Sequence, residues 1–176
     1  MRWCLRQGEL LGLKWEDVDL EAGILSVRRS LAWVKRKPVF NQPKNGKGRS
    51  IRLPRAATEA FKRHRAAQHA ERLRLGGLWG EGGLVFPGER GQPMRAFTVT
   101  GGSFKRLLKR AGLPEKTRFH DLRHTCATLL LLEGVHPKFV QELLGHTTIS
   151  ITLDTYSHVM PGMGDQTAVA MERALI

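Results

Sequence analysis

The chain has 176 residues, and its hydrophobic content of 41% is sufficient for a packed core of one domain. Its 29 lysines and arginines outnumber 16 acidic residues, which gives a formal net charge of +13 and a pI near 10.7. A chain this basic is expected to bind a polyanion, most often nucleic acid, although a generally solvated basic surface is the alternative. Without an apolar run of about 18 residues, the sequence predicts no membrane-spanning helix.

The first third of the sequence predicts a short helix followed by a small antiparallel sheet. Apolar residues indicate the helix over residues 10–15. Residues 24–34 have the pattern of one strand, and residues 37–54 that of a second strand, an Asn-Gly turn and a third strand. This turn carries Lys44 and Lys47.

Acidic and cysteine residues give no metal-binding pattern. Residues 16–21 form the only acidic cluster, which contains no other type of metal ligand and is interpreted as a solvated turn. Cys4 and Cys126 are expected to form neither a disulfide framework nor a metal site, and they suit a reducing cytosol.

The rest of the chain is predicted to be helical. Gly134 and Gly145 are C-cap signals, Pro137 suits a first turn, and Ser150 is a candidate N-cap. Apolar periodicity and these signals place helical segments at residues 55–75, 99–113, 120–134, 136–146, 150–161 and 165–176. The predicted fold is therefore α+β and mostly helical, with a small three-stranded antiparallel sheet.

The segment "HDLR" contains a candidate anion site. His120 and Arg123 are three residues apart, so they share one helix face near the predicted N-terminus. An exposed pair at this place favours an anion, because the backbone N–H groups and the helix dipole attract the same charge. The alternative is an ordinary surface contact.

Two further candidates follow within one compact segment. His146 comes directly after Gly145, where a histidine is also a common C-terminal cap. Tyr156 is the only tyrosine of the chain, and it is either a nucleophile or a packed residue whose hydroxyl is satisfied.

These motifs together resemble the tyrosine recombinase, or phage integrase, family. The resemblance rests on "LR-x-GEL" near the start, "HDLRHTCAT", and "LLGHTTISITLDTYSHV", and it covers nearly the whole chain. The family's functional positions fall on Arg6, Lys44, His120, Arg123, His146 and Tyr156.

The resemblance implies that DNA is cut by transesterification. Tyr156 would attack a phosphodiester and form a 3′-phosphotyrosyl link, which a 5′ hydroxyl can reverse without ATP. A phenol has a pKa near 10 and must lose its proton, for which His120 is the candidate general base. Lys44 is the candidate general acid for the leaving 5′ oxygen, with Lys47 as a rival.

Positive hydrogen-bond donors would stabilise the transition state. Arg6 and Arg123 are the candidates for binding the nonbridging oxygens, and His146 would add a further donor. Glu9 stands three residues after Arg6 and can hold it in place. This chemistry requires no metal and no other cofactor.

The resemblance also implies partners and a domain. Double-stranded DNA is the expected partner, with no membrane, and the family acts as a homo-oligomer, a tetramer, on DNA. Residues 165–176 would dock on a neighbouring protomer or fold back on their own domain. Residues 1–176 correspond to the family's catalytic domain without its N-terminal DNA-clamping domain. We therefore expect little complete recombination from this chain alone, in the cytoplasm of a bacterium and encoded by the bacterium or a phage.

Two rival functions use the same fold. One is a DNA-binding remnant or regulator that no longer cuts, although binding alone requires none of Lys44, His146 and Tyr156. The other is a type I-B topoisomerase, which uses related chemistry and would relax supercoiled DNA.

Overall fold

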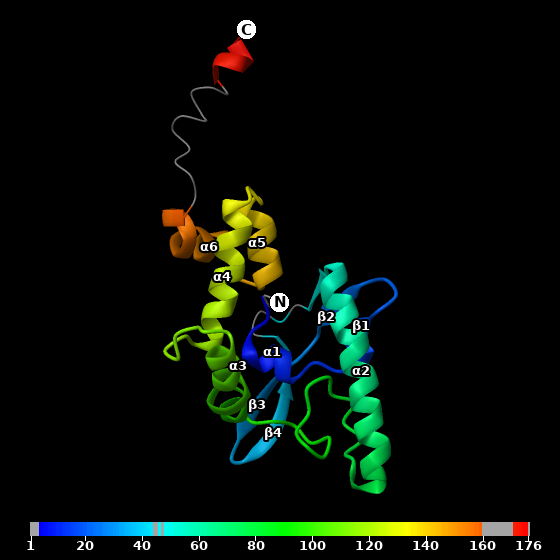
Figure 1. Ribbon diagram of the computed structural model, residues 1–176. Coiled ribbons are helices and arrows are strands. Elements are labelled where there is room, and N and C mark those ends of the chain that lie inside the picture. Colours follow the sequence, from blue (N-terminus) through cyan, green and yellow to red (C-terminus); the bar gives the residue numbers. More distant parts are fainter. Residues whose placement is uncertain (1–3, 44–45, 47, 160–170, 176) are drawn as a thin grey trace.

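The computed structural model describes residues 4–43, 46, 48–159 and 171–175 (Figure 1). Its α-helices are α1 (Gln7–Leu11), α2 (Arg55–Leu75), α3 (Phe104–Arg110), α4 (Phe119–Leu132), α5 (Pro137–Leu144) and α6 (Ile149–Tyr156). Its short helical turns are η1 (Trp15–Asp17), η2 (Gly76–Leu78), η3 (Thr98–Ser103) and η4 (Ser157–Val159). Its strands are β1 (Val18–Asp19), β2 (Ile24–Val27), β3 (Ser30–Val34), β4 (Lys37–Asn41) and β5 (Arg49–Arg52). The α+β, mostly helical class predicted from the sequence is confirmed.

A three-stranded antiparallel sheet is present, but its strands are not the three predicted. β1 was not predicted, and β2 covers only the first part of the strand expected at residues 24–34. Its order is β1-β2-β5, whereas β3 and β4 form a separate hairpin. The prediction of one continuous strand over residues 24–34 is wrong. The chain leaves β2 at Arg28 and Arg29, and both side chains turn to the carboxylate of Asp17.

The acidic cluster at residues 16–21 is not wholly a solvated turn. The Asp17 side chain is buried, and Arg29 Nη1 lies 2.7 Å from its Oδ2 atom. A buried carboxylate needs such a partner, because its desolvation is otherwise uncompensated. The interpretation as a solvated turn holds for Glu16 and Asp19, which are exposed.

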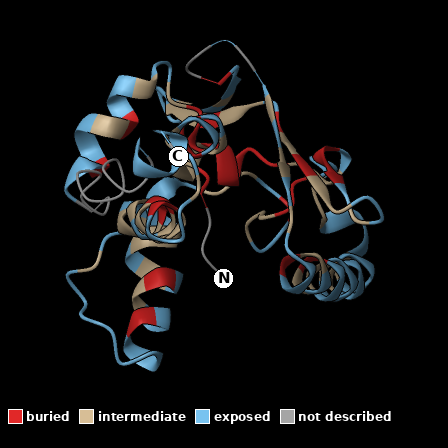
Figure 2. Ribbon diagram, turned by 90° about the horizontal axis from the view of Figure 1, so that it is seen from above, coloured by how far each residue is buried: buried red, intermediate tan, exposed pale blue. Residues whose placement is uncertain are grey.

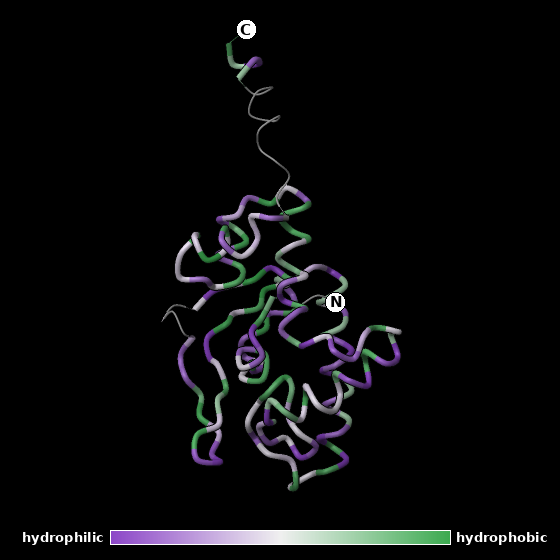
Figure 3. Tube along the Cα trace, turned by 90° about the vertical axis from the view of Figure 1, so that its left-hand side faces the viewer, coloured by the Kyte–Doolittle hydropathy of each residue, from purple (hydrophilic) through white to green (hydrophobic). Residues whose placement is uncertain are grey.

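Two hydrophobic clusters form the core. The first joins α1, the sheet and α2, and it contains Leu10, Leu25 and Phe61. The second joins α4, α5 and α6, which pack together at one end of the molecule (Figure 1). Figure 2 shows that buried residues lie where these elements face one another, whereas most of α2 is exposed. Hydrophobic and hydrophilic residues are interspersed along the coloured parts of the trace (Figure 3), as expected for amphipathic elements.

The path from α5 to α6 is set by local signals. Pro137 begins α5, and Gly145 ends it with φ of +65°, a left-handed conformation that glycine adopts without strain. The following helix begins at Ile149 with Thr148 as N-cap, so Ser150 is not the cap that the sequence indicated. This tight turn brings residues 143–146 next to α6.

Cys4 and Cys126 form a disulfide, with their Cα atoms 6.1 Å apart. The expectation that they form none is wrong, because 122 residues of sequence separate two positions that the fold brings together. The link joins the segment before α1 to the middle of α4. Among the described residues, no helix is both long and apolar enough to cross a bilayer.

Candidate active site

The end of α5 gathers three arginine side chains from distant parts of the chain. Arg49, Arg123 and Arg6 donate, in that order, to the backbone carbonyl oxygens of residues 143, 144 and 145. The bonds from Arg49 and Arg6 measure 2.9 and 3.1 Å. The last carbonyls of a helix lack intrahelical donors and carry partial negative charge, so they are natural partners for guanidinium groups.

Glu9 is the carboxylate that neutralises part of this cluster. Its side chain is 2% exposed and accepts hydrogen bonds of 3.0 and 2.7 Å from Arg49. Arg6 donates to it from Nη1 at 3.1 Å and from its backbone N–H at 2.9 Å. Burial opposes ionisation, but these bonds and charges outweigh it and hold the pKa of Glu9 below its ordinary value. The prediction that Glu9 holds Arg6 in place is confirmed.

Arg123 is buried, and not exposed on the helix surface as the sequence indicated. The residue is 3% exposed, and it donates to the carbonyl oxygens of Cys4 and Leu144. Burial and the positive charge of Arg6 lower its pKa to about 10, so the group stays protonated at neutral pH. The two arginines that the resemblance indicates therefore lie in one electrostatic cluster, and both donate to protein carbonyl oxygens at the end of α5.

His146 directly follows the arginine-binding carbonyls. Its Nδ1 atom lies 2.9 Å from Thr152 Oγ1, and its backbone carbonyl accepts a 2.7 Å bond from Gln141. Burial, then the charges of Arg123 and Arg6, lower the pKa of His146 to about 4. At neutral pH the ring is therefore uncharged and contributes a hydrogen bond, not a positive charge.

This low pKa predicts a specific loss of stability in acid. Between the folded-state pKa of about 4 and the ordinary value of 6.5, the unfolded chain binds the proton more readily. The contribution of His146 is therefore complete above 6.5 and is lost as the pH falls towards 4. We expect His146→Asn to lose less stability than wild type over this interval, measured by urea unfolding at several pH values. Parallel curves for the two proteins would contradict the prediction.

Tyr156 is a packed residue whose hydroxyl has a hydrogen-bond partner, which is one of the two interpretations that its sequence left open. It is 3% exposed and belongs to the second core cluster. Its hydroxyl lies 2.9 Å from Nδ1 of His124 on α4. Burial raises the pKa of Tyr156 above its ordinary value, although the nearby charge of Arg123 opposes the rise. The hydroxyl is thus protonated at neutral pH and lies within electrostatic reach of a buried guanidinium.

His124 is a residue that the sequence analysis missed. It stands four residues after His120, and the two rings meet edge to face with centroids 4.8 Å apart. His120 is exposed, and partial burial followed by the charges of His124 and Arg123 lowers its pKa. Among the described residues, His124 is the side-chain hydrogen-bond partner of the Tyr156 hydroxyl. The four-residue spacing between His120 and His124 could have indicated His124 as a candidate, since residues i and i+4 share a helix face.

Lys44 and Lys47 lie outside the described residues. The strand that follows their turn, β5, begins with Arg49, which is fixed to Glu9 and to the end of α5. Of the segment 165–176, residues 171–175 are described, and Met171 and Leu175 are exposed there.

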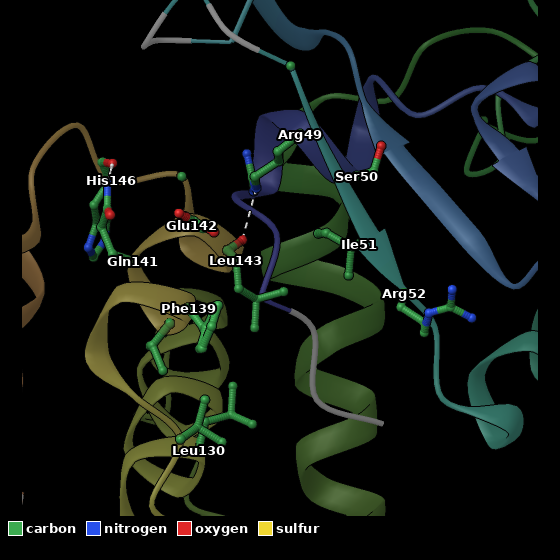
Figure 4. A pocket seen from close by; sticks show the side chains of 14 residues that line it. Arg49, Ser50, Ile51, Arg52, Leu130, Phe139, Gln141, Glu142, Leu143 and His146 are labelled. Atoms are coloured by element: carbon green, nitrogen blue, oxygen red, sulfur yellow. Dashed lines mark hydrogen bonds between the residues drawn. The ribbon is translucent and has the colours of Figure 1, made fainter.

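A pocket of about 730 Å³ lies between β5 and the helices α4 and α5 (Figure 4). We call it the β5–α5 pocket. Leu130, Ile51 and Phe139 supply apolar walls, and Phe139 is 65% exposed. Arg49, a member of the arginine cluster, and His146 also line the pocket.

Comparison with known sequences gives the class of protein. The sequence profile described as the phage integrase family matches residues 2–162. The chain therefore belongs to the phage integrase family, the tyrosine recombinases, which confirms the resemblance seen in its motifs.

Particular relatives are similar over most of this chain. A protein described as "Tyrosine recombinase XerC-like" from Caldanaerobacter subterraneus subsp. tengcongensis is 41% identical over 170 residues, which cover 89% of this chain and 43% of the relative. The prophage integrase IntR of Escherichia coli K12 is 32% identical and is covered over 42% of its length. The chain thus spans less than half the length of these curated relatives.

Solved structures agree with the fold. The Tn1549 transposon integrase in complex with transposon right end DNA is 28% identical, with a TM-score of 0.75 over 98% of this chain and 55% of that one. The XerH recombinase in a post-cleavage complex with a palindromic difH substrate is 25% identical, with a TM-score of 0.67 over 97% of this chain and 43% of that one.

Proposed function

We propose that residues 1–176 are the catalytic domain of a site-specific DNA recombinase that cuts and rejoins DNA through a 3′-phosphotyrosyl intermediate. The observation that carries the proposal is the arrangement of Arg6 and Arg123 on the end of α5, with the Arg123 charge within electrostatic reach of the Tyr156 hydroxyl. Its site of action would be bacterial DNA, in the cytoplasm.

The arginine cluster supports phosphoryl transfer. Negative charge builds on the nonbridging phosphate oxygens in the transition state, and fixed donors stabilise it without reorganising. Arg6 keeps 32% of its side chain exposed, so it can donate to an incoming phosphate. His146 would add an uncharged donor beside it. Because these groups supply the stabilisation, we propose a metal-independent reaction.

Transesterification needs two proton transfers. The Tyr156 oxygen forms a bond to phosphorus while the bond from phosphorus to the sugar 5′ oxygen breaks. The family resemblance gives the phenol proton to His120 and assigns protonation of the 5′ oxygen to Lys44. The 5′ hydroxyl of another strand can then reverse the step, since the phosphotyrosyl ester conserves the energy of the broken bond.

DNA binding is supported by charge and by the relatives. The net charge of +13 favours a polyanion. The Tn1549 integrase and XerH structures are described as complexes with their DNA substrates. We therefore propose that this domain binds double-stranded DNA through phosphate contacts, with an affinity that falls as salt rises.

A covalent-adduct assay tests the function. A duplex nicked near the cut site traps the intermediate, because the short cleaved strand diffuses away. Wild type should give a protein–DNA band that resists SDS, and Tyr156→Phe should give none, since it lacks the attacking oxygen. As a matched control, Tyr156→Phe should still shift the same duplex in a salt-sensitive way. A wild-type shift without any covalent band on the chain's own recombination site would contradict the proposal.

The alternative is a DNA-binding regulator that does not cut. The burial of Tyr156, at 3% exposure, favours it, because a buried hydroxyl is not open to a phosphate. The adduct assay separates the two functions, since a regulator gives the shift alone.

We further propose that the domain assembles as a homo-oligomer on DNA. Residues 165–176 would lie as a helix in a groove of a neighbouring protomer. The exposed Met171 and Leu175 and the apolar walls of the β5–α5 pocket support this arrangement. Counting protomers per DNA in the adduct-forming complexes, with and without residues 165–176, provides the readout.

A further inference from the structure

We propose that His124 is a further catalytic residue, which accepts the hydroxyl proton of Tyr156 as the phenol oxygen attacks phosphorus. The inference rests on the proposed function and adds a residue that touches the reacting oxygen. The observation behind it is direct, because His124 Nδ1 lies 2.9 Å from the Tyr156 hydroxyl. General bases act within about 2.6–3.2 Å of the proton that they take.

The packing of α4 against α6 fixes this contact. The Tyr156 ring is held in the core by Ala127 and Leu131 of α4 and by residues of α5, so its hydroxyl has little freedom to turn. His124 lies on α4 next to Arg123 in sequence, which places proton acceptor and phosphate-binding group on the same turn. Its Nδ1 atom can accept a proton when the other ring nitrogen, Nε2, carries the hydrogen.

His120 is less well placed for this task. Its ring meets His124 edge to face at 4.8 Å, and it forms no described hydrogen bond to the Tyr156 hydroxyl. It is also exposed, on the turn of α4 before His124. The geometry therefore gives the first proton transfer to His124 and leaves His120 to contact the His124 ring.

Neighbouring groups influence the positive charge that the His124 ring gains when it accepts the proton. The bond from Oη to phosphorus forms, the bond from phosphorus to the 5′ oxygen breaks, and the phenol proton moves to Nδ1. The resulting imidazolium contacts the His120 ring and directly follows the positively charged Arg123 in sequence. The Asp121 carboxylate, one turn earlier, interacts favourably with a charge on His124, and its own pKa is lowered first by its hydrogen bonds from Arg118. Rejoining returns the proton from Nδ1 to the phenol oxygen.

A matched pair of variants tests the assignment. Asn can keep a hydrogen bond near the Nδ1 position but does not accept a proton at neutral pH. We expect His124→Asn to slow adduct formation on the nicked duplex by about 10²–10⁴-fold, the usual contribution of a general base, and His120→Asn to slow it less. Added imidazole should restore part of the rate to His124→Ala, with a pH dependence that follows the free base. A merely structural role predicts no such rescue.

A second measurement works without DNA. In the ¹⁵N spectrum of the imidazole groups, the His124 Nδ1 resonance should move between wild type and Tyr156→Phe, because the substitution removes the donated hydrogen bond. Melting temperatures and the salt-sensitive DNA shift show that each variant is folded.

The outcomes separate this inference from the function on which it rests. A near-wild-type adduct rate from folded His124→Asn, or imidazole rescue confined to His120→Ala, would overturn the assignment and leave the function standing. An unchanged Nδ1 resonance would also count against it. If wild type gives no Tyr156-dependent adduct, the proposed function fails and this inference fails with it.

Discussion

Replacing Arg123 with alanine should slow covalent adduct formation by at least about 10²–10³-fold, the range found when one preorganised transition-state donor is removed. The same change should destabilise the fold. It leaves the carbonyl oxygens of Cys4 and Leu144 without their donor, and an unsatisfied buried acceptor costs about 1–3 kcal/mol. Single-turnover kinetics and urea unfolding measure the two effects separately.

Arg118→Ala is the matched control for Arg123. Arg118 lies at the start of the same helix, but its side chain is 77% exposed and pairs with the partly exposed Asp121. Surface ion pairs contribute little to stability. If Arg118→Ala slowed adduct formation as much as Arg123→Ala does, the assay would report the loss of any positive charge and not the loss of the buried donor.

Replacing Glu9 with glutamine should produce the largest loss of stability, about 3–5 kcal/mol, because it leaves the mostly buried guanidinium group of Arg49 without its counter-charge. Glu9 is 2% exposed and holds both Arg49 and Arg6. Because its folded-state pKa lies below the ordinary value of 4.5, its contribution is complete above that value and is lost as the pH falls through the folded-state pKa. Wild type and Glu9→Gln should therefore converge in stability in strong acid.

Glu16→Gln provides the comparison. Glu16 pairs with Arg29 at 2.8 Å, but its side chain is 60% exposed. Urea unfolding at neutral pH should leave this variant close to wild type, because water already solvates the pair. Equal destabilisation by the two substitutions would refute the importance of burial at Glu9.

The sequence predicted the parts of this fold that depend on local signals. The helices α2, α4 and α5 follow from periodicity, from Pro137 and from the capping glycines. Periodicity could not reveal that the strand at residues 24–34 breaks, because the ion pairs of Arg28 and Arg29 with the buried Asp17 at this point are tertiary contacts. The pairing of Cys4 with Cys126 has the same origin, since it joins positions 122 residues apart.

The sequence identified most residues of the candidate site, but it did not reveal which of these residues contact one another. Motif resemblance gave Arg6, Arg123, His146 and Tyr156, and Glu9 followed from its spacing. It did not give Arg49, whose partner Glu9 lies 40 residues earlier. Nor did it give His124, because a helix with several polar positions does not reveal which one faces the nucleophile.

The anchoring of three guanidinium groups on one helix end has a consequence for control at a distance. Arg6 precedes α1, Arg49 lies in β5 and Arg123 lies in α4, yet each donates to a carbonyl oxygen of residues 143–145. A small axial shift of α5 would thus reorient the three guanidinium groups together. Phe139 and Leu143 of this helix also line the β5–α5 pocket (Figure 4). An occupant of that pocket that shifts α5 would therefore change the affinity of the proposed site for phosphate, and by reciprocity phosphate binding would change the affinity for the occupant.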